Sequence, residues 1–189
     1  MALVSFTSCG DSKMAKELEG EWQAEYTATF SDGEKDETTE YITFSCQETS
    51  NNDDGTFVET RHTRTNEMEY GEDTYQLQYT SRVEGTYSVM FGNLYLTYDL
   101  STLQVNVTPH DVKVTPGSLS SALEMMSDAF ETLEDPRKDI ARESRKEVYS
   151  NLFELYQNNS DASFKNLKVN GNTMSYDSED GDITYTRIK

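Results

Sequence analysis

A regular alternation of apolar and polar residues constrains this chain more than any other feature. In the segment GEWQAEYTATF, Glu, Gln and Thr residues alternate with Trp22, Ala24, Tyr26, Ala28 and Phe30. Successive side chains of a β-strand point to opposite faces, so a period of two predicts a strand with one buried and one wet face. Asp32-Gly33 is a turn signal that ends this strand.

The same alternation returns along most of the chain. Strands are expected at 41–46, 56–65, 73–83, 85–91, 94–100 and 103–107, with Gly, Asn and Asp turns such as Gly92-Asn93 between them. Three more strands are expected after Ser163, around the hairpin signals Asn170-Gly171 and Asp180-Gly181. Many short Tyr- and Thr-rich strands with such turns predict an antiparallel sandwich or barrel.

A helical pattern interrupts the strands after Pro116-Gly117. Apolar residues follow one another at alternating distances of four and three positions, which is typical of one face of a helix: Leu119, Leu123, Met126, Phe130 and Leu133. Asp135-Pro136 then suits the N-cap and first position of a second helix. The insertion, residues 118–159, is expected to pack on the core of a single domain that covers residues 18–189.

The opening stretch LVSFTSCGDSK resembles a bacterial lipobox, because an apolar run and two small residues lead directly to Cys9. The resemblance implies that lipid is attached to Cys9 and anchors the protein in a membrane. Residues 1–17 are then a signal-peptide remnant, the lipobox and a flexible tether. Only eight residues precede Cys9 and none is basic, so a complete signal would be longer. The alternative is an ordinary N-terminal segment, whose Cys9 could pair with Cys46, a residue otherwise expected to be buried.

Gly20-x-Trp22 on the first strand resembles the signature of the lipocalins and related calycins. In that superfamily the tryptophan plugs the closed base of an antiparallel barrel, and an arginine near the end of the last strand lies across it. Arg187 in DITYTRIK stands in the matching place. With the lipobox, the chain resembles lipocalin-like lipoproteins of Gram-negative envelopes. This resemblance implies a mostly β fold, namely a barrel of about eight to ten strands with two helices between the late strands. It also implies that the protein is anchored to the outer membrane and faces the periplasm or the cell surface. Another antiparallel sandwich that buries a tryptophan is the alternative.

Composition and the remaining motifs argue against several functions. The formal net charge of −19 opposes binding to nucleic acid and to an anionic membrane surface. His62 and His110 have no neighbours at metal-ligand or catalytic spacing. The segment Asp177–Asp182 places its glycine one position too early for a calcium loop. The sequence therefore predicts no catalysis, no cofactor and no metal.

Four tyrosines, Tyr26, Tyr79, Tyr87 and Tyr98, share the apolar faces of their expected strands. In an open barrel they would line a pocket for a small apolar or aromatic ligand, whereas in a filled barrel they belong to the core. The expected function is a lipid-anchored, non-catalytic binding protein of the cell envelope. The alternative is a protein-interaction module with a filled barrel that binds another envelope protein through the helical insertion.

Overall fold

A computed structural model describes residues 9–29, 35–47, 54–70, 73–115, 136–159, 162–177 and 183–189. The helices are α1 (Cys9–Leu18), α3 (Pro136–Asn158) and the short 3-10 helix η1 (Pro109–Asp111). The strands are β1 (Gly20–Thr29), β2 (Lys35–Cys46), β3 (Asp54–Tyr70), β4 (Asp73–Met90), β5 (Asn93–Asn106), β6 (Val112–Thr115), β7 (Ala162–Asn170), β8 (Thr173–Asp177) and β9 (Ile183–Arg187).

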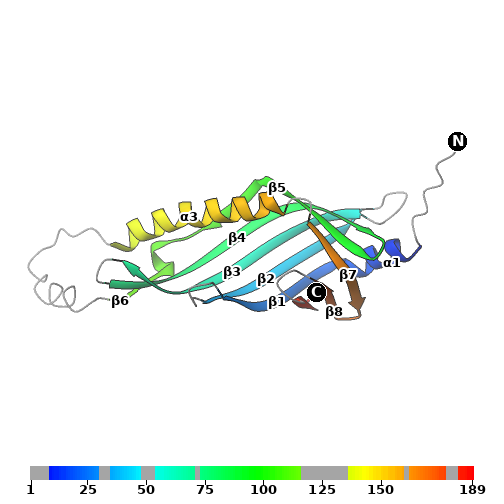
Figure 1. Cartoon of the computed structure of the whole chain (residues 1–189), viewed down its shortest axis with the longest axis horizontal. Coiled ribbons are helices and arrows are strands. Elements are labelled where there is room, and N and C mark those ends of the chain that lie inside the picture. The colour runs from blue at the N-terminus through cyan, green and yellow to red at the C-terminus, as the bar shows by residue number, and fades with distance from the viewer. Residues whose placement is uncertain are drawn as a thin grey trace, which may run out of the picture.

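Eight of these strands close into a ring. Their order is β3-β2-β1-β9-β8-β7-β5-β4, and β4 pairs again with β3. Every pair is antiparallel. The early part of β4, Thr74 to Leu77, pairs with β6, and its later part, from Thr80 to Met90, pairs with β5. The helix α3 is inserted between β6 and β7 in an elongated molecule (Figure 1). The prediction of an antiparallel barrel of eight to ten strands with a helical insertion is therefore confirmed.

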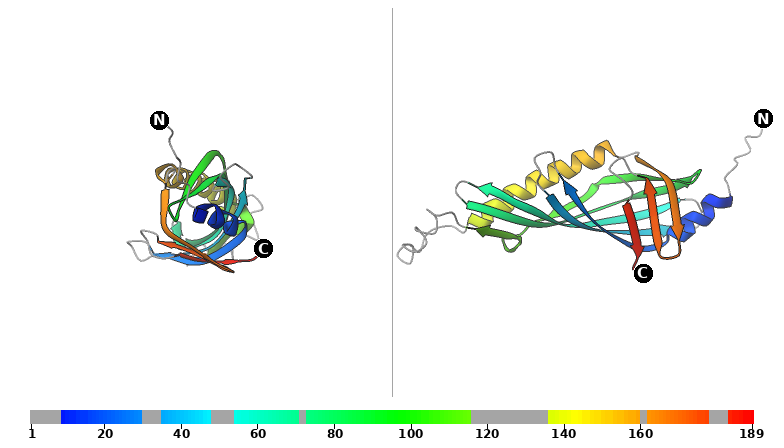
Figure 2. Two further views of the ribbon diagram at one scale, coloured as in Figure 1. Left: turned by 90° about the vertical axis from the view of Figure 1, so that its right-hand side faces the viewer. Right: turned by 60° about the horizontal axis from the view of Figure 1, so that its bottom comes forward.

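The prediction of a flexible tether is wrong for residues 10–17, because they belong to α1. In this helix Ala15 and Leu18 have no exposed surface, and Met14 packs partly buried against the same core. These residues fall on one side of the helix and turn it into a plug. Figure 2 shows α1 inside the ring when the barrel is viewed along its length from this end. Residues 1–8, the expected signal remnant, lie outside the described residues.

Trp22 lies directly beneath this plug. Its indole Nε1 donates a 2.7 Å hydrogen bond to the carbonyl oxygen of Leu18, and its ring is completely buried. The guanidinium carbon of Arg187 lies 4.1 Å from the centroid of the Trp22 ring system. The Arg187 Nη atoms donate to the carbonyl oxygens of Glu17 and Glu19. Arg187 therefore bridges the tryptophan and the carboxyl end of α1, where a cation is favourable.

Gly20 is required at this end of the barrel by its surroundings. Its φ of +124° lies in a region that side chains rarely adopt, and a Cβ atom built there would lie 2.5 Å from the Lys189 carbonyl oxygen. The same atom would lie 2.7 Å from Arg187 Nη1. The glycine of the Gly-x-Trp motif thus lets the C-terminus close over β1.

The β4–β5 hairpin turns one residue earlier than predicted. Its two loop residues are Phe91 and Gly92, with φ values of 54° and 73°, the two positive angles that a type I′ turn needs. Phe91 ends the strand predicted over 85–91 and shares the parity of Tyr87 and Val89, which are buried. It instead points outward, with 81% of its surface exposed.

The insertion is described only from Pro136 onward. As expected, α3 begins there, and its Ile140 and Ala141 pack against the inner faces of β4, β5 and β6. Further along, Leu152 and Tyr156 join the main core. The helix expected over residues 119–133 and the Asp180-Gly181 turn lie outside the described residues. Cys46, expected to be buried, is half-buried at the end of β2.

Candidate functional site: a polar cluster inside the barrel

Three charged side chains point into the barrel at its middle. Glu40 of β2 and Glu59 of β3 are 2% and 1% exposed, and Arg61 of β3 is the direct cross-strand partner of Glu40. They face inward because they share the parity of their buried strand neighbours, such as Ile42 on β2 and Phe57 on β3. We call Glu40, Glu59, Arg61 and the tyrosines that bond to them the central polar cluster.

Arg61 pairs with both carboxylates without satisfying its Nε group. This atom lies 2.8 Å from Glu59 Oε1 and 3.1 Å from Glu40 Oε2. Neither contact has hydrogen-bond geometry, so Nε is buried without a hydrogen-bond partner among the described residues. The side chain as a whole is 21% exposed, whereas its partners are almost fully enclosed.

A second buried polar atom without a hydrogen-bond partner in the described ranges belongs to the residue opposite Arg61 on the neighbouring strand. Ser81 of β4 is the cross-strand partner of Arg61 and is 1% exposed. Within the described part of the chain, its Oγ is likewise buried and without a hydrogen-bond partner. Nearly all buried polar groups in proteins have a hydrogen-bond partner, so Arg61 Nε and Ser81 Oγ are two exceptions on adjacent strands.

Tyrosine hydroxyls fill the acceptor positions of Glu59. Tyr156 of α3 donates to Oε1 at 2.5 Å, and Tyr98 of β5 donates to Oε2 at 3.1 Å. The Arg61 guanidinium also lies over the Tyr156 ring, with 5.4 Å between its Cζ atom and the centroid of the ring. Glu59 therefore connects the inserted helix to β3 and β5.

Glu40 is held in the same way from the other side of the ring. Tyr26 of β1 donates to Oε2 and Tyr185 of β9 donates to Oε1, both at 2.8 Å. The hydroxyl of Tyr176 on β8 lies 2.9 Å from that of Tyr185. The cluster thus reaches elements from both ends of the sequence.

Burial and charge set the ionisation of these groups. Burial raises the pKa of Glu59, and Glu40 raises it further, while Arg61 opposes the shift. Burial alone would lower the pKa of Arg61, but Glu59 and Glu40 raise it well above its ordinary value. Burial likewise raises the pKa of Tyr98 and Tyr156, so their hydroxyls stay protonated and donate. Arg61 is consequently a permanent cation inside the barrel.

The four tyrosines expected to line a lumen separate into two pairs. Tyr87 and Tyr98 are 2% and 9% exposed and belong to the packed core. Tyr26 and Tyr79 are only partly buried and lie one inward row beyond Arg61, on the side away from α1. Of the four tyrosines, Tyr26 and Tyr79 are therefore the two that keep part of their surface accessible.

A separate groove of about 610 Å³ crosses the outer face of the barrel. It is lined by outward-facing side chains in register, among them Glu25, Thr39, His62, Thr80, Glu37 and Arg64. His62 Nδ1 lies 3.1 Å from Thr80 Oγ1. Residues of the inward row between these outward rows, Tyr26, Thr38, Thr63 and Tyr79, also contribute to the lining, whereas Glu40 and Arg61 do not.

Sequence reasoning missed Glu40, Glu59, Arg61 and Ser81. A signal was present, since Glu40 shares the parity of Ile42 and Phe44 and so breaks the alternation of its strand. What parity could not show is which charges meet, because that depends on the register between strands.

Comparison with models of protein families finds no match for this chain, and comparison with curated proteins finds none either. No described helix is long and apolar enough to cross a membrane. In the ranges that the structure describes, no group of three or more His, Cys, Asp or Glu side chains is arranged to hold a metal ion.

Proposed function

We propose that the protein is a non-catalytic binding protein of the cell envelope, anchored by lipid at Cys9, that holds a small molecule inside the barrel beyond Arg61. The observation that carries the proposal is the pair of buried, unsatisfied polar atoms, Arg61 Nε and Ser81 Oγ, on neighbouring strands. The lipobox resemblance supports the anchor.

Energetics favour a binding role over a purely structural one for this cluster. Burying an ion costs several kcal/mol, and apolar residues of similar volume often stabilise a core better than buried ion pairs do. A barrel centre that only had to be filled would gain from aliphatic side chains. Two glutamates around one arginine are therefore better explained by something that the arginine recognises.

The chemistry of the site indicates the ligand class. Arg61 and Ser81 can donate hydrogen bonds, and Glu40 and Glu59 already oppose the Arg61 charge, so the site matches an uncharged oxygen acceptor such as a carbonyl or hydroxyl group. The partly buried rings of Tyr26 and Tyr79 offer an apolar surface next to it. A small uncharged molecule with an aromatic or apolar body and one oxygen acceptor fits both features.

Native mass spectrometry of the chain with α1 intact, purified gently from a bacterial host, tests the proposal. We expect a discrete added mass that is lost on denaturation and is absent from Arg61→Met and Ser81→Ala. Ser45→Ala, on the outer face of β2, is the matched control and should keep the added mass. A bare polypeptide mass after exposure to a metabolite and lipid extract would reject the site.

A specific observation also favours the second candidate, a protein-interaction module. Tyr149 and Leu155 of α3 are 40% and 42% exposed, and the Tyr149 ring stacks on Phe153 at 6.2 Å. Exposed apolar side chains that form a contiguous patch mark protein contacts, and Tyr149, its stacked neighbour Phe153 and Leu155 are the residues of α3 that would form one. Tyr149→Ser with Leu155→Ser should abolish capture of an envelope protein while leaving the added small-molecule mass intact. The reverse pattern would assign binding to the barrel.

The anchor has its own test. Cys9→Ala, expressed with a complete signal, should move the protein from the membrane fraction to the soluble fraction. Continued sedimentation with membranes would reject lipid attachment at Cys9.

A further inference from the structure

We propose that the tip of the β4–β5 hairpin, Met90-Phe91-Gly92, is a membrane-contact element that inserts Phe91 into a lipid bilayer surface. The barrel would then stand with its α1 end toward the membrane and the space beyond Arg61 facing away. This inference rests on the proposed anchor at Cys9 and adds the orientation of the anchored molecule.

Phe91 is unusual in both its exposure and its backbone. It is 81% exposed and its neighbour Met90 is 43% exposed, which makes the tip strongly apolar. Its φ of 54° lies in the left-handed region, which a bulky residue rarely adopts. A type I′ turn favours Asn, Asp or Gly at this position. An aromatic residue here is unfavourable for both solubility and backbone conformation, which indicates a role outside the fold itself.

The tip is also held rigidly. Asp11 of α1 accepts hydrogen bonds from the Phe91 and Gly92 amides, each at 3.1 Å. From the other side, the Leu167 amide of β7 donates to the Gly92 carbonyl oxygen at 2.9 Å. These bonds hold the backbone of the turn on both sides, while the Phe91 side chain stays 81% exposed.

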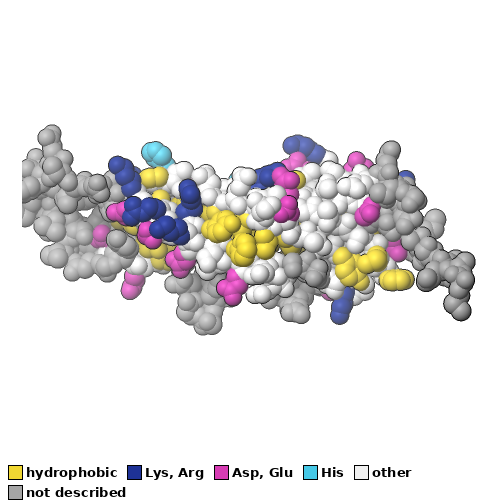
Figure 3. Space-filling view, turned by 90° about the horizontal axis from the view of Figure 1, so that it is seen from above, with side chains coloured by type: hydrophobic (Ala, Val, Ile, Leu, Met, Phe, Trp, Pro, Cys, Tyr) yellow, Lys and Arg dark blue, Asp and Glu magenta, His cyan; other side chains and the backbone are white. Residues whose placement is uncertain are grey.

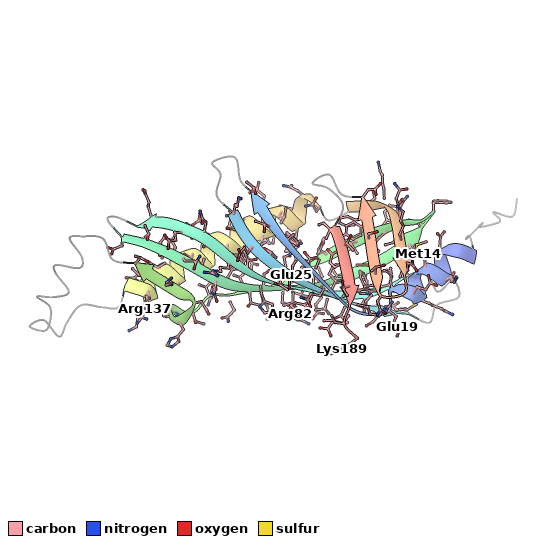
Figure 4. All side chains as sticks on the ribbon, turned by 90° about the horizontal axis from the view of Figure 1, so that it is seen from below. Met14, Glu19, Glu25, Arg82, Arg137 and Lys189 are labelled. Carbon is pink, nitrogen blue, oxygen red and sulfur yellow. The ribbon has the colours of Figure 1, made fainter. Side chains whose placement is uncertain are left out.

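The position of the tip relates it to the anchor. Cys9 is the first residue of α1 and stands only two residues before Asp11, about 3 Å along a helix axis. Figure 2 shows α1 and the β4–β5 turn at the same end of the molecule, and Figure 3 shows apolar side chains gathered at that end. Figure 4 labels Met14 of α1 at this end and Arg137, at the start of α3, at the other. An acyl chain on Cys9 would bring the bilayer to the tip.

A single acyl chain makes the contribution of the tip measurable, because one chain alone gives only marginal membrane binding. A myristoyl-length chain is coupled chemically to Cys9 in the full chain carrying Cys46→Ala, and binding to phosphatidylcholine vesicles is measured. Phe91→Asn should weaken vesicle binding about tenfold, as expected for losing one buried apolar side chain. It should not lower the stability of the fold, since Asn suits the turn.

Tyr149→Asn is the matched control, because it removes an exposed aromatic ring from α3 and should leave vesicle binding unchanged. Equal binding of the Phe91→Asn and unsubstituted coupled proteins would overturn the inference. Since the chain is attached chemically, this result does not depend on whether cells lipidate Cys9. Failure of the anchor would appear instead in the fractionation of Cys9→Ala.

Discussion

Replacing Trp22 by alanine should remove the side chain around which the α1 end of the barrel is built. Truncating a buried tryptophan costs about 3–5 kcal/mol in a core. The Leu18 carbonyl oxygen would also lose its 2.7 Å donor, which adds about 1 kcal/mol, and Arg187 would lose its aromatic partner, which adds about 0.5 kcal/mol. Because these contributions overlap, we expect the free energy of unfolding to fall by about 4–6 kcal/mol.

Urea unfolding followed by far-UV circular dichroism measures this loss. Tryptophan fluorescence is unsuitable because Trp22 is the single tryptophan of the chain. Trp22→Phe is the control, since it keeps most of the ring but cannot donate to Leu18, and it should cost about 1–2 kcal/mol. A loss below about 1 kcal/mol for Trp22→Ala would refute the reasoning, because a fully buried tryptophan cannot be removed so cheaply from a packed core.

Three further predictions concern other parts of the barrel. Gly20→Ala should lower the free energy of unfolding, measured in urea, by at least about 2 kcal/mol, because the added Cβ would meet a backbone carbonyl oxygen. Gly171→Ala is the control, since Gly171 also has a positive φ but lies in open space, and it should cost only about 1 kcal/mol. Burial raises the pKa of Glu59 above its ordinary 4.5, so the folded state keeps a proton that the unfolded state releases. Unfolding free energies measured across pH should therefore fall as the pH rises from about 4.5 toward neutral, and Glu59→Gln should lack this component; parallel pH profiles would contradict the shift. Asp11→Ala should lower stability by about 2–3 kcal/mol and raise hydrogen exchange at the Gly92 amide, which loses its charged acceptor; unchanged exchange there would show that α1 does not hold the hairpin.

The central polar cluster shows where sequence reasoning stops. Alternation assigned Tyr26, Tyr79, Tyr87 and Tyr98 to inner faces, and all four do face inward. Alternation could not show that Tyr87 and Tyr98 are buried in the core while Tyr26 and Tyr79 are only partly buried, because burial depends on how far along the barrel axis each residue lies. Strand register and the placement of α3 decide this distance, and neither can be read from a single strand.

The N-terminal segment shows a different limit. Gly10, Asp11, Ser12 and Lys13 look like a polar tether, and local propensity gives no reason to expect a stable helix of ten residues. The helix exists because Ala15 and Leu18 are buried in the end of the barrel and Asp11 meets the β4–β5 turn. Tertiary contacts here override local preference.

Period and turn chemistry are local properties, so the sequence by itself determined a mostly antiparallel β fold, the start of α3 at Pro136 and the inward face of the strand segments that it predicted, Phe91 excepted. It did not determine that the segments 73–83 and 85–91 correspond to the single strand β4, or that 94–100 and 103–107 correspond to the single strand β5. Only the tertiary structure decided that α1 plugs the ring, that Phe91 stands exposed, and that Glu40, Glu59, Arg61 and Ser81 meet at its centre. These outcomes depend on closure of the sheet. Closure places β1 beside β9 and sets an inserted helix against β5, over distances in the chain that no local pattern encodes.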